Sequence, residues 1–361
     1  MTPPNAPFTK LLLKWHKKEN TRLMPWKGEK DPYKIWLSEI ILQQTRVEQG
    51  WAYYERFLEA FPTVVQLARA PQQKVFKLWE GLGYYNRCRN LIETAKTIAT
   101  TYKGQFPSSY EAILALKGIG PYTAAAIASF AFALPHAVVD GNVERVLARY
   151  FGISTPVDNA AGKKLYTSLA NTLLYRPQPG LYNQAIMDFG AVVCKPRNPL
   201  CSTCPMRADC QAYGHGWTDT LPVKGKSLVK KERWLYYFIL QTSDGKVYVR
   251  RRKGKDIWEG LHEFVLWETD SPVPEEELLR TPFATELFGR RSLTVRHISK
   301  VYRQELSHQT IQGQFIGILL HAPLPKLKGY RLVSRQKMEG YAFPGFINAW
   351  LRDPTPVQSL F

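Results

Sequence analysis

The most concentrated group of reactive side chains is a four-cysteine stretch, "CKPRNPLCSTCPMRADC". Six, two and five residues separate the successive cysteines, so only one tight Cys-x-x-Cys pair is present. Thiols this dense predict a metal centre, because thiolates bind zinc and iron–sulfur clusters. A structural zinc site usually has two tight pairs, so the spacing favours a [4Fe-4S] cluster but leaves zinc open. The candidate ligands are Cys194, Cys201, Cys204 and Cys210.

Two carboxylates in unlike surroundings are the second candidate for chemistry. Glu39 is the only acid in the apolar run "IWLSEIIL", where burial would raise its pKa, unless it lies on the exposed stripe of an amphipathic helix. Asp140 in "VVDGNVERVL" fits a helix N-cap, where backbone N–H groups would keep its pKa low. One protonated acid and one anion suit cleavage of a glycosidic bond. A plain capping role for Asp140 is the simpler alternative.

A glycine-containing turn, "LKGIGPYTAAAI", separates two apolar helical stretches. Gly118 and Gly120 would let the backbone approach a ligand closely and direct N–H groups outward at a helix N-terminus. Pro121 suits the first position of the following helix. The turn could therefore bind a phosphate, although a helical hairpin without a ligand would have the same sequence.

The periodicity divides the chain into two classes of structure. Residues 8–212 carry apolar side chains at helical spacing and predict an all-α domain over residues 1–213. Residues 214–232 are polar, basic and interrupted by Gly and Pro, which predicts a linker. Residues 233–361 are predicted to form an α+β domain, with a hairpin formed by "WLYYFILQT" and "VYVRRR" and a helix over "PEEELLRTPFA".

The composition favours a polyanionic partner. The formal net charge is +19, and the excess of basic residues extends over both halves of the chain. Runs of 18 or more apolar residues are absent, and the N-terminus lacks the order of charges in a signal peptide, so we expect an intracellular protein without a membrane span. In that compartment the cysteines should not form disulfides, and the isolated Cys88 should be a core residue.

Taken together, these segments resemble the helix-hairpin-helix DNA glycosylase superfamily, and within it the MutY-type adenine DNA glycosylases. The resemblance extends over residues 20–212 and rests on the cysteine loop and on "PYKIWLSEIILQQTRVE", "WEGLGYYNRCRNL", "LKGIGPYTAAAI", "VVDGNVERVLARY" and "YNQAIMDFGAVVC". The C-terminal half resembles that family's Nudix-like domain through "WEGLHEF", "ELSHQT" and "YAFP". It lacks the Arg-Glu-x-x-Glu-Glu core of a Nudix box, so it resembles a recognition domain more than a hydrolase.

The resemblance implies a monomeric repair enzyme with a [4Fe-4S] cluster that removes adenine opposite 8-oxoguanine or guanine in duplex DNA. Glu39 would protonate adenine at N7 and then activate water, and Asp140 would stabilise the cationic sugar, with Tyr122 and Asn142 oriented around them. The target adenine would have to leave the stacked duplex, because its glycosidic bond cannot be reached inside the stack. The residues implied to contact the DNA or its bases are Arg22, Trp26, Gln43, Gln44, Thr45, Arg46, Leu82, Gly83, Tyr84, Gly118, Gly120, Ser307 and His308.

Several positions depart from the relatives. Tyr122 stands where bifunctional relatives such as endonuclease III have a Schiff-base lysine, so the resemblance implies a monofunctional enzyme. Lys27 replaces a common arginine, Glu144 stands where some MutY proteins have a lysine, and Leu306 replaces a usual phenylalanine. Two alternatives stay open at this point. One is a lyase acting on oxidised pyrimidines, and the other is a non-catalytic DNA-binding or electron-transfer protein.

Overall fold

The computed structural model describes residues 6–225, 229–254, 256–324 and 327–354. The chain divides into two compact units, and the first holds residues up to Arg69 together with the stretch from Arg89 to the linker. All regular elements in its described part are helical, as the spacing of apolar residues predicts. They are α1 (Ala6–Lys18), α2 (Pro32–Leu42), α3 (Val47–Ala60), α4 (Val64–Arg69), most of α6 (Tyr85–Thr101), α7 (Tyr110–Leu114), α8 (Pro121–Phe132), α9 (Gly141–Phe151), α10 (Ala160–Leu173), α11 (Pro179–Val192), α12 (Gln211–Gly214) and two 3-10 turns, Cys201–Thr203 and Arg207–Asp209.

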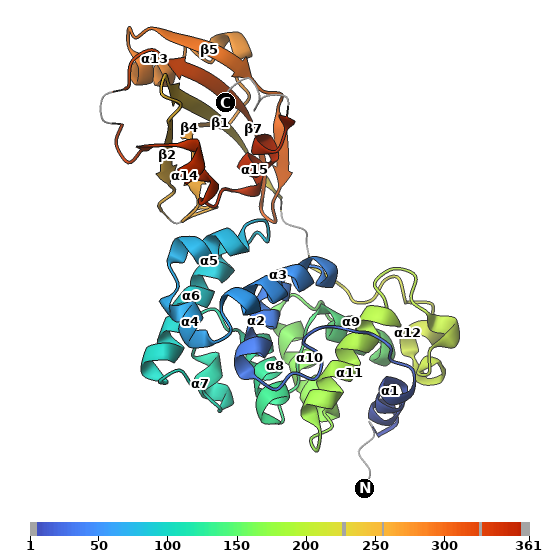
Figure 1. The fold of residues 1–361 in the computed structure, drawn as a ribbon. Helices are drawn as coiled ribbons and strands as arrows, with labels where there is room; N and C mark the ends of the chain where they lie inside the picture. Colours follow the sequence, from blue (N-terminus) through green and yellow to red (C-terminus); the bar gives the residue numbers. More distant parts are fainter. Residues whose placement is uncertain (1–5, 226–228, 255, 325–326, 355–361) are drawn as a thin grey trace. The chain divides into compact units, whose positions relative to one another are not determined.

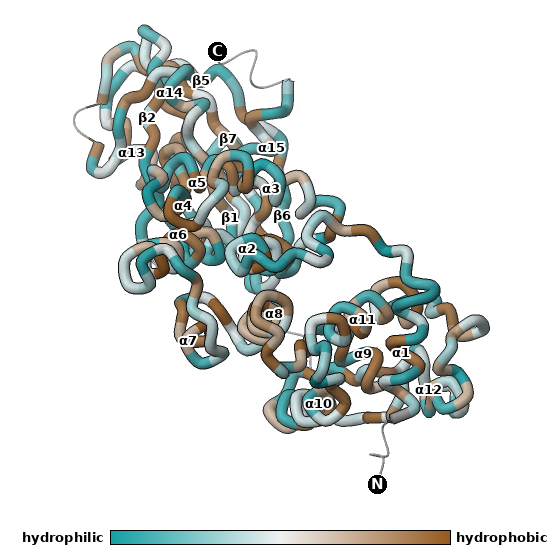
Figure 2. The backbone as a smooth tube through the Cα atoms, turned by 60° about the horizontal axis from the view of Figure 1, so that its bottom comes forward, coloured by the Kyte–Doolittle hydropathy of each residue, from teal (hydrophilic) through white to brown (hydrophobic). Residues whose placement is uncertain are grey.

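Two helices at the centre of this unit are apolar on most of their surface. Every residue of α2 from Ile35 to Ile41 is buried, and α8 is buried from Thr123 to Ser129. Figure 2 shows α8 as one of the largely hydrophobic segments. Because a helix that is apolar all round must be covered on every side, α2 and α8 form the interior against which the amphipathic helices pack. Glu39 therefore lies in the core, and the alternative of an exposed stripe does not apply.

The second unit is built on an eight-stranded sheet and contains the C-terminal part of the chain (Figure 1). Its strands are β1 (Lys231–Thr242), β2 (Val247–Arg251), β3 (His262–Glu263), β4 (Val265–Thr269), β5 (Leu293–Ile298), β6 (Tyr302–Glu305), β7 (Gln309–Leu320) and β8 (Arg331–Val333). The main path runs β3-β2-β1-β7-β5, and the long central strands β1 and β7 are parallel. The antiparallel pairing of β1 with β2 confirms the predicted hairpin.

Helices cover both faces of this sheet. On one face Phe238 packs near Phe288 of α13 (Pro282–Phe288). On the other face Phe315 stacks on Trp350 of α15 (Gly345–Leu351), with ring centroids 4.8 Å apart. Successive residues of a strand point to opposite faces, which is why both central strands are buried along most of their length. A short helix, α14 (Arg335–Glu339), follows β8.

The single helix predicted over residues 274–284 is wrong. The structure has a 3-10 turn at Glu275–Glu277 and begins α13 only at Pro282. Proline is favoured at the first helical position but not inside a helix, and the side chain of Thr281 caps the new helix through the Ala284 N–H. This Thr-Pro pair therefore starts a second element.

Residues Ala70–Cys88, which carry α5 (Gln72–Trp79), group with the second unit. Glu80 accepts hydrogen bonds from the Phe343 N–H at 2.8 Å and from the Asn348 side chain at 3.0 Å. Gln73 donates to the Gly340 carbonyl at 3.0 Å. This grouping was not expected from the sequence, because each hydrogen-bond partner lies more than 260 residues away along the chain.

Candidate active site

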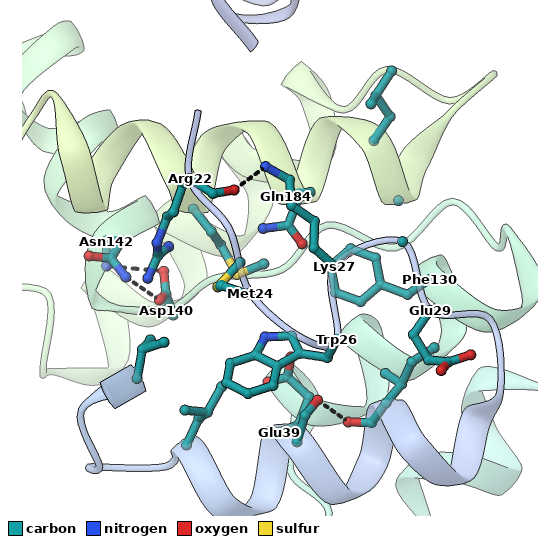
Figure 3. Close-up of a pocket in the computed structure, with 18 of the residues that line it drawn as sticks. Arg22, Met24, Trp26, Lys27, Glu29, Glu39, Phe130, Asp140, Asn142 and Gln184 are labelled. Atoms are coloured by element: carbon teal, nitrogen blue, oxygen red, sulfur yellow. Dashed lines mark hydrogen bonds between the residues drawn. The ribbon is translucent and has the colours of Figure 1, made fainter. Parts of the chain in front are cut away.

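A pocket of about 460 Å³ lies in the first unit, where α2, α8, α9 and α11 meet the segment of residues 22–30 (Figure 3). Figure 3 shows Glu39 rising from α2 on one side, with Asp140 and Asn142 beyond it. The pocket brings together seven of the site residues predicted from the sequence, which are Arg22, Trp26, Glu39, Thr45, Tyr122, Asp140 and Asn142. The apolar packing of α2 and the cap of α9 therefore place the two candidate carboxylates in one cavity.

Glu39 is the acid of this pocket that most favours its protonated form. Its exposed fraction is 7%. Burial raises its pKa to about 7, a hydrogen bond with Tyr122 acts in the opposite direction, and the charge of Asp140 raises the pKa further. A carboxyl group with such a pKa can exchange a proton near neutral pH.

Asp140 is the N-cap of α9, as predicted. Its Oδ1 accepts hydrogen bonds from the N–H groups of Asn142 at 3.0 Å and Val143 at 2.9 Å, and its Oδ2 accepts one from the Asn142 amide at 2.7 Å. The expected low pKa is nevertheless wrong in direction. Burial raises the pKa of Asp140, and this effect exceeds the lowering by the three hydrogen bonds and by Arg145.

Tyr122 lies on the first turn of α8 and contributes its hydroxyl to the pocket. The hydroxyl is 3.6 Å from the Met187 sulfur, and burial, followed by the charges of Glu39 and Asp140, raises its pKa. Tyr122 is therefore a neutral hydrogen-bond donor at physiological pH. Asn142 links Asp140 to Arg145, which donates to the Asn142 side-chain oxygen at 2.8 Å.

Sequence reasoning missed Asp188, which organises one wall of the pocket from behind. Its side chain is fully buried and accepts hydrogen bonds from Arg22 at 2.9 Å, Asn20 at 2.8 Å and Gln184 at 3.0 Å, while Lys27 lies 3.3 Å away. The signal that pointed to Glu39 is also present here, because Asp188 is the only acid in the apolar run "AIMDFGAVV". Gln184, which lines the pocket one turn earlier on α11, was missed too.

The residues expected to contact DNA or bases near α2 either line the pocket or lie in the turn that follows α2. Trp26 packs edge-to-face on Tyr54 at the pocket wall. Gln43 is the C-cap residue of α2 and donates to Thr123 at 3.2 Å, and Gln44 has a left-handed backbone with φ of 59°. Thr45 lines the pocket, and the exposed Arg46 precedes α3.

The predicted glycine turn joins α7 to α8, and Pro121 is the first residue of α8, as expected. Gly118 has φ of 76°, and a Cβ atom there would lie 2.6 Å from the Asn90 Cβ, so only glycine fits. Gly120 is the N-cap of α8, and a Cβ atom there would meet nothing within 4 Å. The turn thus has an open side at a helix N-terminus.

The four cysteines of the loop line one small cavity of about 30 Å³ beneath α9. Arg149 of α9 donates to the Cys194 sulfur at 3.5 Å and to the Lys195 carbonyl at 2.7 Å. In the described part of the chain, no three His, Cys, Asp or Glu side chains converge closely enough to hold a single metal ion. Cys88, in contrast, is fully buried in the core, as predicted.

In the second unit, two candidate contact regions meet. Tyr84 exposes 47% of its surface, and its hydroxyl forms a 2.7 Å hydrogen bond with the Ser307 hydroxyl. Gly81, Gly83 and Tyr84 all have positive φ, so the turn reverses sharply and projects the tyrosine. Leu82 is buried, whereas Ser307 and His308 are exposed at the turn between β6 and β7.

A helical unit with a hairpin, a buried acid and a capping aspartate in one pocket defines the helix-hairpin-helix class of base-excision glycosylases. Residues 37–169 match the HhH-GPD superfamily of base excision DNA repair proteins, and residues 236–352 match the NUDIX domain. The chain is 36% identical over 259 residues to the adenine DNA glycosylase of Buchnera aphidicola subsp. Baizongia pistaciae, covering 71% of this chain and 73% of that protein. It is 40% identical over 214 residues to the adenine DNA glycosylase of Homo sapiens, covering 57% of this chain and 39% of that protein. The chain belongs to the MutY-type adenine DNA glycosylase family, with a Nudix-like C-terminal domain.

Solved structures resemble the helical part of the chain. A thermostable thymine-DNA glycosylase has a TM-score of 0.54 at 32% identity, covering 58% of this chain and 97% of that one. A trapped endonuclease III–DNA covalent intermediate has a TM-score of 0.51 at 20% identity, covering 59% of this chain and 98% of that one, a likeness of fold alone. None of the helices within the described ranges is long and apolar enough to cross a membrane.

Proposed function

We propose that this enzyme hydrolyses the N-glycosidic bond of adenine paired with 8-oxoguanine or guanine in duplex DNA. The observation that carries the proposal is the buried Glu39, whose pKa is raised to about 7, in a pocket shared with Asp140. The pocket is walled by protein on several sides, so the target nucleotide has to leave the duplex to enter it. The net charge of +19 favours binding of the DNA backbone.

The two carboxylates have different roles in the proposed mechanism. Glu39 donates a proton to N7 of adenine, which makes the base a better leaving group, and its carboxylate then activates the attacking water. Asp140 stabilises the positive charge that develops on the sugar. Asn142 orients Asp140 through the hydrogen bond from its amide, and Tyr122 lowers the pKa of Glu39. General acid catalysis of this kind contributes roughly 10²–10⁴-fold.

The proposed reaction is hydrolysis without strand cleavage, because the position of the Schiff-base lysine in endonuclease III is Tyr122 here. A single-turnover assay on duplexes with adenine opposite 8-oxoguanine tests this. Strand breaks should appear only after hot alkali, which cleaves at abasic sites. Breaks without alkali would indicate a lyase. Glu39→Gln should abolish excision while duplex binding is kept, and retained excision would exclude the acid role.

Recognition of the opposite base is assigned to Tyr84, Ser307 and His308, which lie together in the second unit. The exposed tyrosine ring offers a stacking surface for a base, and the serine and histidine offer hydrogen-bonding groups. Gln43, Gln44, Thr45 and Arg46 are proposed to approach the space that the flipped adenine vacates. Excision rates opposite 8-oxoguanine and guanine, compared for Ser307→Ala and wild type, test this assignment.

Cys194, Cys201, Cys204 and Cys210 are proposed to hold a [4Fe-4S] cluster. All four line one cavity, yet no three of them converge on a point that suits a single ion. Zinc would need all four sulfurs at about 2.3 Å from one centre, whereas a cubane has four separate iron corners. The cluster would stabilise the loop that packs under α9. Cys204→Ser should lose iron and sulfide in purified protein, and Cys88→Ala is the matched control that should keep both.

A further inference from the structure

A second and larger pocket, of about 660 Å³, lies entirely among residues of the second unit. It is formed by β2, β3, β8 and neighbouring loops, with Phe76 of α5 at its edge. Four of its lining side chains are cationic, and among the described lining residues none is acidic. We name it the cationic pocket, after Arg250, Arg251, Lys253 and Arg331.

Three of these four cations have no acidic partner among the described residues. Among the described residues, Arg251, Lys253 and Arg331 form no salt bridge, and all three are exposed. Arg250 differs because its Nε donates to the buried Glu263 at 2.8 Å. Cations gathered around a concave site without neutralising partners repel one another, so an anion between them would be stabilised.

The same pocket contains flat aromatic surfaces. The ring of His262 stacks on Tyr341 with centroids 3.9 Å apart, and the Arg250 guanidinium lies 4.7 Å from the Tyr330 ring. The Nδ1 atom of His262 is buried and has no hydrogen-bond partner among the described residues. Burial, and secondly Arg251, lower the pKa of His262 to about 4, so the ring is neutral and offers no charge of its own.

We propose that the cationic pocket binds one nucleotide unit, with its phosphate between Arg251, Lys253 and Arg331 and its base against the His262–Tyr341 stack. Phosphate groups suit several cations in a concave site, and bases of any sequence stack on flat rings. The nucleotide unit could come from a single-stranded stretch of DNA or from a free nucleoside phosphate. The site is separate from the pocket that holds Glu39 and Asp140, which is lined by the first unit alone. It therefore stands whether or not the proposed excision mechanism is correct.

The test uses the full-length protein and thymidine 5′-monophosphate, a nucleotide without adenine that the catalytic pocket has no reason to prefer. Its affinity is measured by calorimetry, together with amide hydrogen exchange of the β2 and β8 peptides. Lys253→Gln/Arg331→Gln is the informative variant, because neither side chain bonds to another described residue and the fold should be kept. Arg290→Gln/Arg296→Gln is the control, because it removes the same charge from exposed positions outside the pocket.

We expect the mononucleotide to protect the β2 and β8 amides, and the pocket variant to weaken binding by about tenfold or more, as loss of charged hydrogen bonds implies. The control should bind as wild type does. Oligothymidylate binding more tightly than the mononucleotide would identify a DNA strand as the source, and equal binding would identify free nucleotides. Inorganic phosphate binding as tightly as the nucleotide would overturn the role of the aromatic stack. Equal losses in both variants, or no protection of β2 and β8, would overturn the site.

Discussion

The carboxylate of Asp188 accepts a 2.9 Å hydrogen bond from Arg22 although none of its side chain is exposed. Lys27 lies 3.3 Å from the second oxygen, and Asn20 and Gln184 also donate to the carboxylate. Four partners offset the unfavourable burial of this charge. Asp188 therefore fixes the positions of two cations and one amide that line the pocket of Glu39 and Asp140, so we regard it as a positioning residue.

Asp188→Asn should destabilise the protein and disturb the pocket together. The change leaves Arg22 and Lys27 without their counter-ion, and breaking a buried ion pair costs about 3–5 kcal/mol. Urea unfolding measures the loss of stability, and single-turnover excision at saturating enzyme measures the effect on the site. Glu59→Gln, an exposed acid on α3, is the control and should change stability by less than about 0.5 kcal/mol. Unchanged stability of Asp188→Asn would contradict the inferred role.

Glu39 should make the protein less stable as the pH rises. Its pKa is about 7 in the folded protein against an ordinary value of 4.5, so folding favours the protonated form. The stability that this group contributes is fully present below pH 4.5 and is lost as the pH rises to 7. The loss corresponds to about 3 kcal/mol at most. Glu39→Gln should therefore be more stable than wild type at pH 8 and similar at pH 4.5, as measured by urea unfolding. The opposite order at pH 8 would show that Glu39 is not buried as described.

Tyr122→Phe should shift the alkaline limb of the pH–rate profile upward. The Tyr122 hydrogen bond lowers the pKa of Glu39, while burial and Asp140 raise it. Without the hydroxyl, Glu39 keeps its proton to a higher pH, so excision should persist above the pH at which wild type declines. Single-turnover rates between pH 6 and 9 measure the limb. A limb that moves to lower pH would show that Tyr122 does not act on Glu39.

How much of the site could be predicted depended on whether the deciding contacts are local. The Asp140 cap was predictable because its partners are two and three residues away. The raised pKa of Asp140 was not, because burial depends on helices brought together by tertiary packing. Glu39 was found from its apolar neighbours. Asp188 has similar neighbours, but its link to the pocket could not be predicted because Arg22 lies 166 residues from it. Likewise, no local pattern shows that Glu80 bonds to Asn348.

Tyr122→Lys should convert part of the reaction into strand cleavage. The lysine would enter a position where the native side chain is partly buried and interacts with Glu39, and burial lowers the pKa of an amine toward the neutral, nucleophilic form. Strand breaks without alkali, and a borohydride-trapped covalent complex with DNA, are the expected products. Glu144→Lys is a matched control, because it introduces the same amine at a different place, on α9 four residues after Asp140. Trapping by the control and not by Tyr122→Lys would place the sugar nearer to residue 144.

The hydrogen bond between Tyr84 and Ser307 should couple the two residues energetically in recognition of the opposite base. Tyr84→Phe and Ser307→Ala each remove one side of the 2.7 Å bond. If the bond orients the tyrosine ring for stacking, the double variant should lose less affinity than the two single variants added together, with a coupling of about 0.5–3 kcal/mol. The coupling for each base is obtained from the affinities for duplexes that carry 8-oxoguanine or guanine opposite adenine. All variants also carry Glu39→Gln, so that the adenine is not removed during the measurement. Ser271→Ala is the control partner for Tyr84→Phe and should be additive. Additivity of the Tyr84–Ser307 pair would show that the two residues contact DNA independently or not at all.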